Sequence, residues 1–262
     1  MSYSKLLVEN VDGVGIIRLN EPATLNAVTI EMVEELDRAL DQLSRSTRAL
    51  ILTGSGRAFC AGANISGGVS IESDDGLPDA GAVLESHINP LMSKLRNLPI
   101  PWISAVRGAA AGVGCSFALA ADLIVAGEGA YFLQAFCRIG LVPDGGSSFL
   151  LTRAIGRPRA MEMMMLGERM PAAKALEWGL VNRVVADDEV ETAAMHIARS
   201  LANGPTRSLG LIREAAWTAA ESGWEQTLAS ERRLQRAAGR TGDHQEGINA
   251  FLEKRPARFT GA

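Results

Sequence analysis

The sequence predicts an α/β fold in which strands and helices alternate early in the chain and helices predominate toward its end. Three short apolar segments, residues 49–54, 101–106 and 122–127, have the length and composition of buried strands. From Ser147 onward, helical periodicity extends almost to the C-terminus. With 262 residues, 47% of them hydrophobic, the chain is long enough to bury a large core.

The N-terminal segment predicts a hairpin followed by a helix. Residues 6–20 contain two apolar strands joined at Asp12-Gly13, a dipeptide that favours a tight turn. Thr29 is a suitable N-cap for an amphipathic helix over 30–44, where apolar side chains recur at helical spacing. The strand at 49–54 follows, so a strand–helix–strand unit is expected here.

The middle of the chain predicts a loop, a helix and further strands. Residues 65–81 are rich in Gly, Ser and Asp and predict a mobile loop that could cover a substrate. A helix broken or started near Pro90 follows over 84–98. Further strands are predicted over 130–136 and, more weakly, over 180–185.

The last part of the chain predicts a separate helical region. Gly204-Pro205 interrupts the helical pattern and separates two helices. We therefore expect a core over residues 1–200 and a C-terminal helical region over 201–262.

Two segments of small residues carry the strongest functional signal. RAFCAGAN (57–64) and RGAAAGVGCS (107–116) each follow a predicted strand and leave the backbone uncovered. Converging backbone N–H groups from two such loops can form an oxyanion hole for a carbonyl oxygen. The alternative is that small residues only let helices pack close to a sheet.

Composition and residue spacing exclude several classes of function. The net charge of −4, with scattered basic residues, gives no reason to expect nucleic acid. No leader pattern and no apolar run of about 18 residues is present, so we expect a cytoplasmic protein without membrane contact. The three histidines and three cysteines lack metal-ligand spacing, and no dinucleotide-binding glycine motif is present, so we expect neither a metal nor a separate cofactor.

Asp144 in GLVPDGGSS is the candidate acid or base beside such an oxyanion hole. Pro143 restricts the approach to this residue, and Gly145-Gly146 let the chain turn so that the carboxylate can face a pocket. The alternative is that Asp144 caps the helix that begins near Ser147.

The order and spacing of three motifs, RAFCAGAN, AVRGAAAGVGCSFALAADLIVAG and IGLVPDGGSSFLLTRAIG, resemble the enoyl-CoA hydratase/isomerase (crotonase) superfamily. ALEWGLVNRVV and AGRTGDHQEGINAFLEKRPARFTG are similar to its phenylacetate-pathway isomerase branch. The resemblance spans nearly the whole chain. It implies a crotonase-like spiral of β-β-α repeats with C-terminal helices that build trimers or dimers of trimers, and an acyl-CoA thioester as substrate.

The resemblance also implies roles for individual residues. The backbone N–H groups of Ala61 and Val113 correspond to the two oxyanion donors, and the segment Ala23–Ala27 corresponds to the approach to the CoA nucleotide. The residues implied in substrate binding are Leu25, Ala27, Gly62, Ala63, Asn64, Gly112, Gly114, Phe136 and Lys254.

The departures from the family pattern favour an isomerase. The two glutamates that activate water in hydratases correspond to Ser116 and Phe136, and neither side chain titrates near neutral pH. Asp144 remains as a single acid/base that could shift a double bond of an enoyl-CoA. Three alternatives stay open: Asp144 as the nucleophile of a dehalogenase-like enzyme, a weakly catalytic acyl-CoA-binding protein, and a residual enoyl-CoA hydratase.

Overall fold

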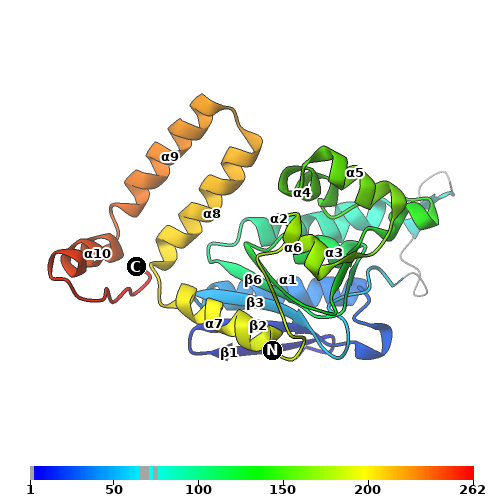
Figure 1. Ribbon diagram of the computed structural model, residues 1–262, viewed down its shortest axis with the longest axis horizontal. Helices are drawn as coiled ribbons and strands as arrows, with labels where there is room; N and C mark the ends of the chain where they lie inside the picture. The colour runs from blue at the N-terminus through cyan, green and yellow to red at the C-terminus, as the bar shows by residue number, and fades with distance from the viewer. Residues whose placement is uncertain (1–2, 65–70, 73–75) are drawn as a thin grey trace.

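The computed structural model describes residues 3–64, 71–72 and 76–262, which form two main sheets, their covering helices and a projecting helical region (Figure 1). The loop predicted over 65–81 falls largely outside the described residues. Within it, two short strands, β4 (Ile71–Glu72) and β5 (Pro78–Asp79), pair with each other.

The larger sheet has six strands in the order β1-β2-β3-β6-β8-β11. The predicted hairpin is confirmed, because the first two strands are antiparallel across Asp12 and Gly13. The other neighbours are parallel. The strands are β1 (Leu6–Val11), β2 (Val14–Leu19), β3 (Ala49–Gly54), β6 (Trp102–Val106), β8 (Leu123–Gly127) and β11 (Arg183–Val185).

A smaller sheet contains β7 (Ala109–Ala111), β9 (Tyr131–Leu133) and β10 (Met170–Pro171), in the order β10-β9-β7. The strand predicted over 130–136 was too long, because the chain leaves the sheet after Leu133. Phe136 lies instead in a 3-10 helix over Ala135–Ile139.

Helices cover both faces of the larger sheet. On one face lie α1 (Ile30–Ser44), whose first turn is capped by the predicted bond from the Met32 N–H to Thr29 Oγ1, and α2 (Asn89–Arg96). A π-helix over Leu84–Ile88 leads into α2, and Pro90 lies in the first turn of α2. On the opposite face, α7 (Val190–Ala202) packs against β3, β6 and β8 in a second apolar core.

The chain alternates between the two sheets. It passes from β6 to β7 and then α3 (Val113–Leu119), and next from β8 to β9 and the 3-10 helix. After α4 (Ser147–Ala154) and α5 (Gly156–Leu166), it returns through β10, α6 (Ala172–Glu177) and β11. Each turn adds a strand to both sheets, which is the predicted β-β-α arrangement.

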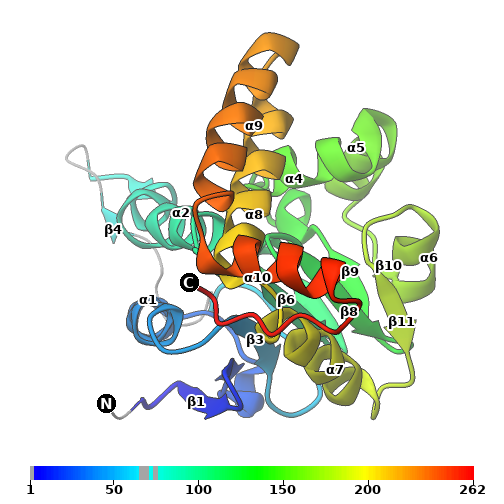
Figure 2. The ribbon, with the colours of Figure 1, turned by 90° about the vertical axis from the view of Figure 1, so that its left-hand side faces the viewer.

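Three further helices project from this core: α8 (Thr206–Glu221), α9 (Trp224–Ala238) and α10 (Gly242–Leu252). Figures 1 and 2 show α8 and α9 side by side as a helical hairpin. The buried Arg213 of α8 anchors this region, because its Nε lies 2.6 Å from Asp122 Oδ2 and its guanidinium donates to the Leu98 carbonyl. No helix in the described part of the chain is both long and apolar enough to cross a lipid bilayer.

Candidate active site

A cavity of about 330 Å³ lies between α1, the π-helix, the 3-10 helix and the two small-residue segments. Among its described lining residues, Asp144 is the only ionisable one, and most of the rest are apolar. The larger apolar side chains are Val28, Ile30, Val33, Val83, Leu84, Ile88, Phe136, Ile139 and Leu141. The predicted residues Ala61, Gly62, Ala63, Gly112 and Val113 also line it.

The first small-residue segment offers a different donor from the predicted one. The N–H of Ala61 donates to the Leu25 carbonyl at 3.0 Å, so it is already used within the protein. The neighbouring Val28 accepts from the Asn64 N–H at 2.9 Å and donates to the Gly62 carbonyl at 2.8 Å. Ala63 lies between these bonds, and its own N–H has no acceptor among the described residues. Among the described residues, the N–H of Ala61 is therefore not free to bind a substrate oxygen, whereas the N–H of Ala63 is.

The second segment presents the N–H of Val113. Val113 is the first residue of α3, so its N–H has no acceptor within the helix. Gly112 has φ 52° and ψ −130°, a conformation that residues with a Cβ rarely adopt, and its N–H donates to the Leu133 carbonyl. Gly114 does not line the cavity, and a Cβ there would lie 2.5 Å from Cys60 Sγ, so its small size lets α3 pack against Cys60.

Asp144 is the ionisable side chain among the described residues that line this cavity. Its Oδ1 is buried and accepts no hydrogen bond within the described part of the chain. Burial raises the pKa of Asp144 to about 6, because the charged form loses hydration without gaining a partner. The alternative of a helix cap is not supported, since Gly146 is the N-cap of α4 and no side chain caps that helix.

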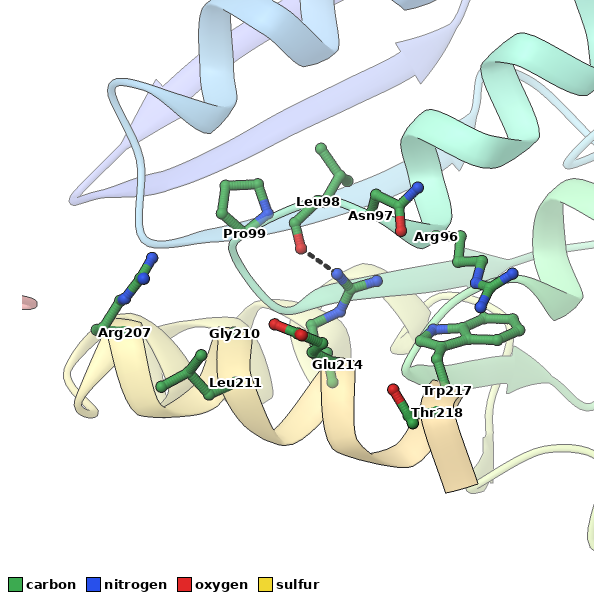
Figure 3. Close-up of a pocket in the computed structure, with 11 residues that line it drawn as sticks. Arg96, Asn97, Leu98, Pro99, Arg207, Gly210, Leu211, Glu214, Trp217 and Thr218 are labelled. Atoms are coloured by element: carbon green, nitrogen blue, oxygen red, sulfur yellow. Dashed lines mark hydrogen bonds between the residues drawn. The ribbon is translucent and has the colours of Figure 1, made fainter. Parts of the chain in front are cut away.

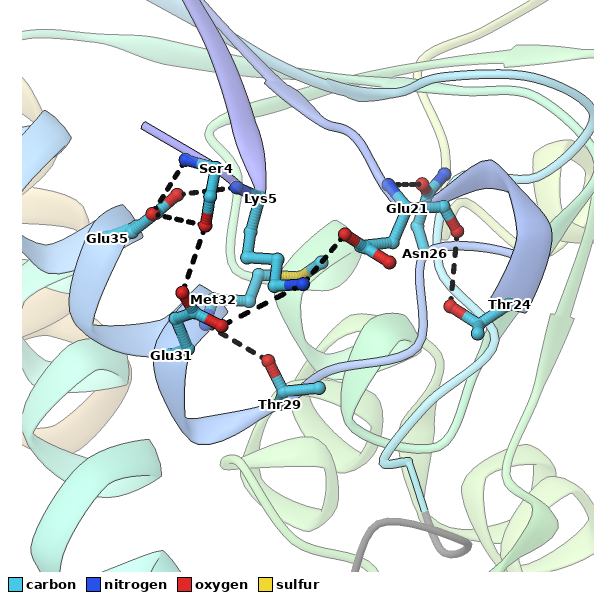
Figure 4. A network of polar contacts seen from close by, with 9 residues as sticks. All are labelled: Ser4, Lys5, Glu21, Thr24, Asn26, Thr29, Glu31, Met32 and Glu35. Atoms are coloured by element: carbon cyan, nitrogen blue, oxygen red, sulfur yellow. Dashed lines mark hydrogen bonds and ion pairs between the residues drawn. The ribbon is translucent and has the colours of Figure 1, made fainter. Parts of the chain in front are cut away.

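Asn26 is a supporting residue that the sequence did not single out. It is fully buried and has a left-handed backbone, with φ 57°. Its Nδ2 donates to the Ser55 and Ala58 carbonyls at 2.9 and 2.8 Å, and its Oδ1 accepts from the Glu21 N–H. Figure 4 shows this side chain beside Glu21. Asn26 thus fixes the chain just before the first small-residue segment.

Other predicted substrate-binding residues lie outside the cavity lining. Leu25 and Ala27 belong to the turn before α1, and Asn64 precedes residues outside the described part of the chain. Lys254 follows α10 and is exposed. The contact of these residues with CoA stays a prediction.

A second cavity, of about 360 Å³, lies between α8 and the segment that joins α2 to β6 (Figure 3). It contains none of the predicted site residues. Two of its basic residues are held by neighbours, since Arg213 donates to the Leu98 carbonyl and Arg96 lies over the ring of Trp217. The described residues contain no cluster of His, Cys, Asp and Glu suited to a metal ion.

Comparison with known proteins decides the family. The model of the enoyl-CoA hydratase/isomerase family matches residues 9–262. The chain belongs to the enoyl-CoA hydratase/isomerase family. It is 42% identical over 251 residues to the 1,2-epoxyphenylacetyl-CoA isomerase of Escherichia coli K12, with 95% of each chain covered. It is 40% identical to a probable enoyl-CoA hydratase of Rhodobacter capsulatus, with 100% of both chains covered.

The solved structures agree with this assignment. Enoyl-CoA hydratase subunit I of Geobacillus kaustophilus superimposes with a TM-score of 0.92 at 35% identity, covering 99% of each chain. The predicted crotonase fold is thereby confirmed. As a member of this family, the chain is an acyl-CoA enzyme of the hydratase or isomerase type.

Proposed function

We propose that this enzyme is an enoyl-CoA isomerase that moves a double bond along the acyl chain, with Asp144 as its single acid/base. The observation that carries the proposal is the cavity lining, in which Asp144 is the one titratable side chain among the described residues. Moving a double bond requires one proton to leave one carbon and one proton to reach another. A single carboxylate with a raised pKa can perform both transfers in turn.

The proposed reaction converts a 3-enoyl-CoA into a 2-enoyl-CoA. The thioester oxygen accepts hydrogen bonds from the N–H groups of Ala63 and Val113. Asp144 removes a proton from C2, and the electron pair of that C–H bond delocalises into a dienolate held by the two donors. The neutral carboxyl then returns the proton to C4. The C3–C4 double bond becomes C2–C3, and Asp144 is again ionised.

Hydration is less well supported by the same cavity. A hydratase must activate water with one group and protonate carbon with another, and the family's two glutamates for this work correspond to Ser116 and Phe136. Phe136 lines the cavity as an apolar wall, while Ser116 is fully buried behind it. The names of relatives do not decide the matter, because an isomerase and a probable hydratase are 42% and 40% identical to the chain.

A nucleophilic Asp144 is the second candidate function. The unpartnered Oδ1 in an apolar cavity also suits attack on an electrophilic carbon of an acyl-CoA, as in a dehalogenase. Mass spectrometry of enzyme quenched during turnover distinguishes the two. A covalent ester on Asp144 supports the nucleophile, and its absence supports the proton shift.

NMR of 3-hexenoyl-CoA and 2-hexenoyl-CoA incubated with the enzyme in D₂O tests the proposal. We expect double-bond migration and no 3-hydroxyacyl-CoA. Deuterium should enter the product only to the extent that the protonated Asp144 carboxyl exchanges with D₂O before it returns its proton. Accumulation of the 3-hydroxyacyl product would establish a hydratase instead. Tight binding without any turnover of these thioesters would favour the acyl-CoA-binding protein. The D144N variant serves as the matched control.

A further inference from the structure

Ser116 and Ser147 form a buried pair of hydroxyl groups behind Asp144. Both side chains belong to residues that are fully buried, one on α3 and one at the start of α4. Their Oγ atoms lie 2.5 Å apart. Neither hydroxyl lines the cavity, so neither contacts the substrate in the proposed reaction.

Both hydroxyl groups lie within hydrogen-bonding distance of the main-chain carbonyl oxygen of Asp144. This oxygen lies 3.0 Å from Ser116 Oγ and 2.8 Å from Ser147 Oγ, and it also accepts from the Ser147 N–H at 3.0 Å. Each hydroxyl has a single proton. These two protons are shared among the Asp144 carbonyl, the neighbouring hydroxyl and, for Ser116, the Gly112 carbonyl at 3.5 Å.

The residue that follows Asp144 lies close against α3. Gly145, with φ 55°, passes so close to Ser116 that a Cβ there would lie 2.8 Å from Ser116 Cβ. The same Cβ would lie 3.5 Å from Val113 Cγ2. Ser116 is three residues after Val113, so the proposed oxyanion donor and this hydroxyl belong to one rigid turn of α3.

We propose that Ser116 and Ser147 are positioning residues that hold the Asp144 main chain at a fixed place relative to the Val113 N–H. The inference rests on the proposed function, because this spacing matters only if Asp144 reacts with a thioester bound at Val113. Ser116 corresponds to a glutamate that activates water in hydratases. In this chain it holds the main chain of the proposed base, Asp144, instead. A displacement of about 1 Å at a reacting group can cost about 100-fold in rate.

Three serine variants test the positioning role. S116A and S147A each remove one hydroxyl from the carbonyl, whereas S148A removes an exposed hydroxyl one residue away on α4 and serves as the matched control. We expect kcat for 3-hexenoyl-CoA to fall about tenfold in S116A and in S147A, with KM nearly unchanged. S148A should equal the wild type.

A second measurement does not depend on turnover. In protein labelled with ¹³C at the aspartate carboxyl carbons, D144N identifies the Asp144 signal. Its titration midpoint should lie near pH 6 in the wild type and S148A and should be lower in S116A and S147A, because a loosened carboxylate gains water. Unchanged midpoints in both variants would overturn the inference.

The two proposals fail in different ways. Full activity in D144N would contradict the proposed function, whatever the serine variants show. Loss of activity in D144N, with S116A and S147A equal to S148A in kcat and in midpoint, would contradict only the positioning role. Circular dichroism and thermal unfolding identify any variant that fails to fold, and if S116A fails, S147A decides the matter.

Discussion

At the scale of single residues, the site depends on the carboxylate of Asp144, whose Oδ1 is buried and has no hydrogen-bond partner among the described residues. Every described side chain around Asp144 in the cavity is uncharged, so no neighbouring charge offsets its loss of hydration. The result is a group that is largely ionised at pH 7 and can still be protonated during turnover. A carboxylate with its ordinary pKa would be a weaker base toward a carbon acid.

The raised pKa of Asp144 predicts a pH-dependent cost in stability. Because the unfolded chain releases this proton near pH 4 and the folded protein only near pH 6, ionisation destabilises the fold progressively between these values. D144N lacks this effect. We expect D144N to be more stable than the wild type at pH 7.5 by up to about 3 kcal/mol, with the difference vanishing below pH 4. Urea unfolding at both pH values measures it, and equal stabilities throughout would contradict the burial argument.

The buried Asn26 predicts a loss of both stability and activity on substitution. N26A leaves the Ser55 and Ala58 carbonyls and the Glu21 N–H without their partner. We expect the free energy of unfolding to fall by about 2 to 4 kcal/mol and kcat to fall because the Ala63 segment loses its support. N10A, which removes an exposed amide that donates to the Ser46 carbonyl, is the matched control. A smaller effect in N26A than in N10A would refute the role of Asn26.

Several residues of the cavity were predicted from the sequence, but the prediction of the Ala61 N–H as the first oxyanion donor does not agree with the hydrogen bonds. Val113, Phe136 and Asp144 were predicted, and all three line the cavity. Ala61 was wrong because its N–H pairs with Leu25, 36 positions earlier in the chain. A hydrogen bond between residues so far apart in the sequence cannot be predicted from the spacing of residues within RAFCAGAN. Asn26 was not predicted for the same reason, because the Ser55 and Ala58 carbonyls that it binds lie about 30 residues away in the sequence.

At the scale of elements, α3 places both the Val113 donor and the Ser116 hydroxyl. All seven of its residues are buried, so the helix has little freedom to shift. Gly112 starts it with a backbone conformation that other residues adopt at a cost of about 1 to 3 kcal/mol.

We therefore expect G112A to lower the free energy of unfolding by about 1 to 3 kcal/mol and to reduce kcat more than tenfold. Thermal unfolding and the 3-hexenoyl-CoA assay measure the two effects. G179A is the control, because Gly179 has a positive φ of 78° and open space around it, and neither it nor its neighbours line the cavity. Equal activity in G112A and G179A would show that the start of α3 does not place a donor.

The helices and strands were predictable where apolar side chains recur with the spacing of a helix or a strand. The hairpin, α1 and the parallel strands of the larger sheet agree with their predictions. The strand β7 was missed because its three alanines lack the bulk typical of strands. The predicted strand at 130–136 was too long because its apolar run continues into a 3-10 helix, where Phe136 is buried against the cavity instead of the sheet.

At the scale of the whole molecule, the projecting helices leave apolar side chains exposed. Phe251 and Leu252 are 83% and 71% exposed at the end of α10, and Trp224 is 70% exposed at the start of α9. We propose that the apolar end of α10 is buried in the trimer or dimer of trimers that the family resemblance implies, because neighbouring large apolar side chains that are this exposed mark interaction surfaces.

We expect light scattering to give the mass of a trimer or hexamer for the wild type and a smaller mass for F251E, which places a charge on this surface. K254E changes the charge of a neighbouring exposed residue and is the control. A monomeric wild type would contradict the proposed assembly.

The most direct test of Asp144 as the sole acid/base is the pH dependence of kcat/KM for isomerisation of 3-hexenoyl-CoA, measured for the wild type and D144N from pH 4.5 to 8. The wild-type value should rise with pH, because the base must be ionised, and level off above a midpoint near 6. D144N should lie about 1,000-fold or more below the wild-type plateau and should lack the rise with pH, while still binding the thioester. D144N activity within tenfold of the wild type would contradict the proposed mechanism.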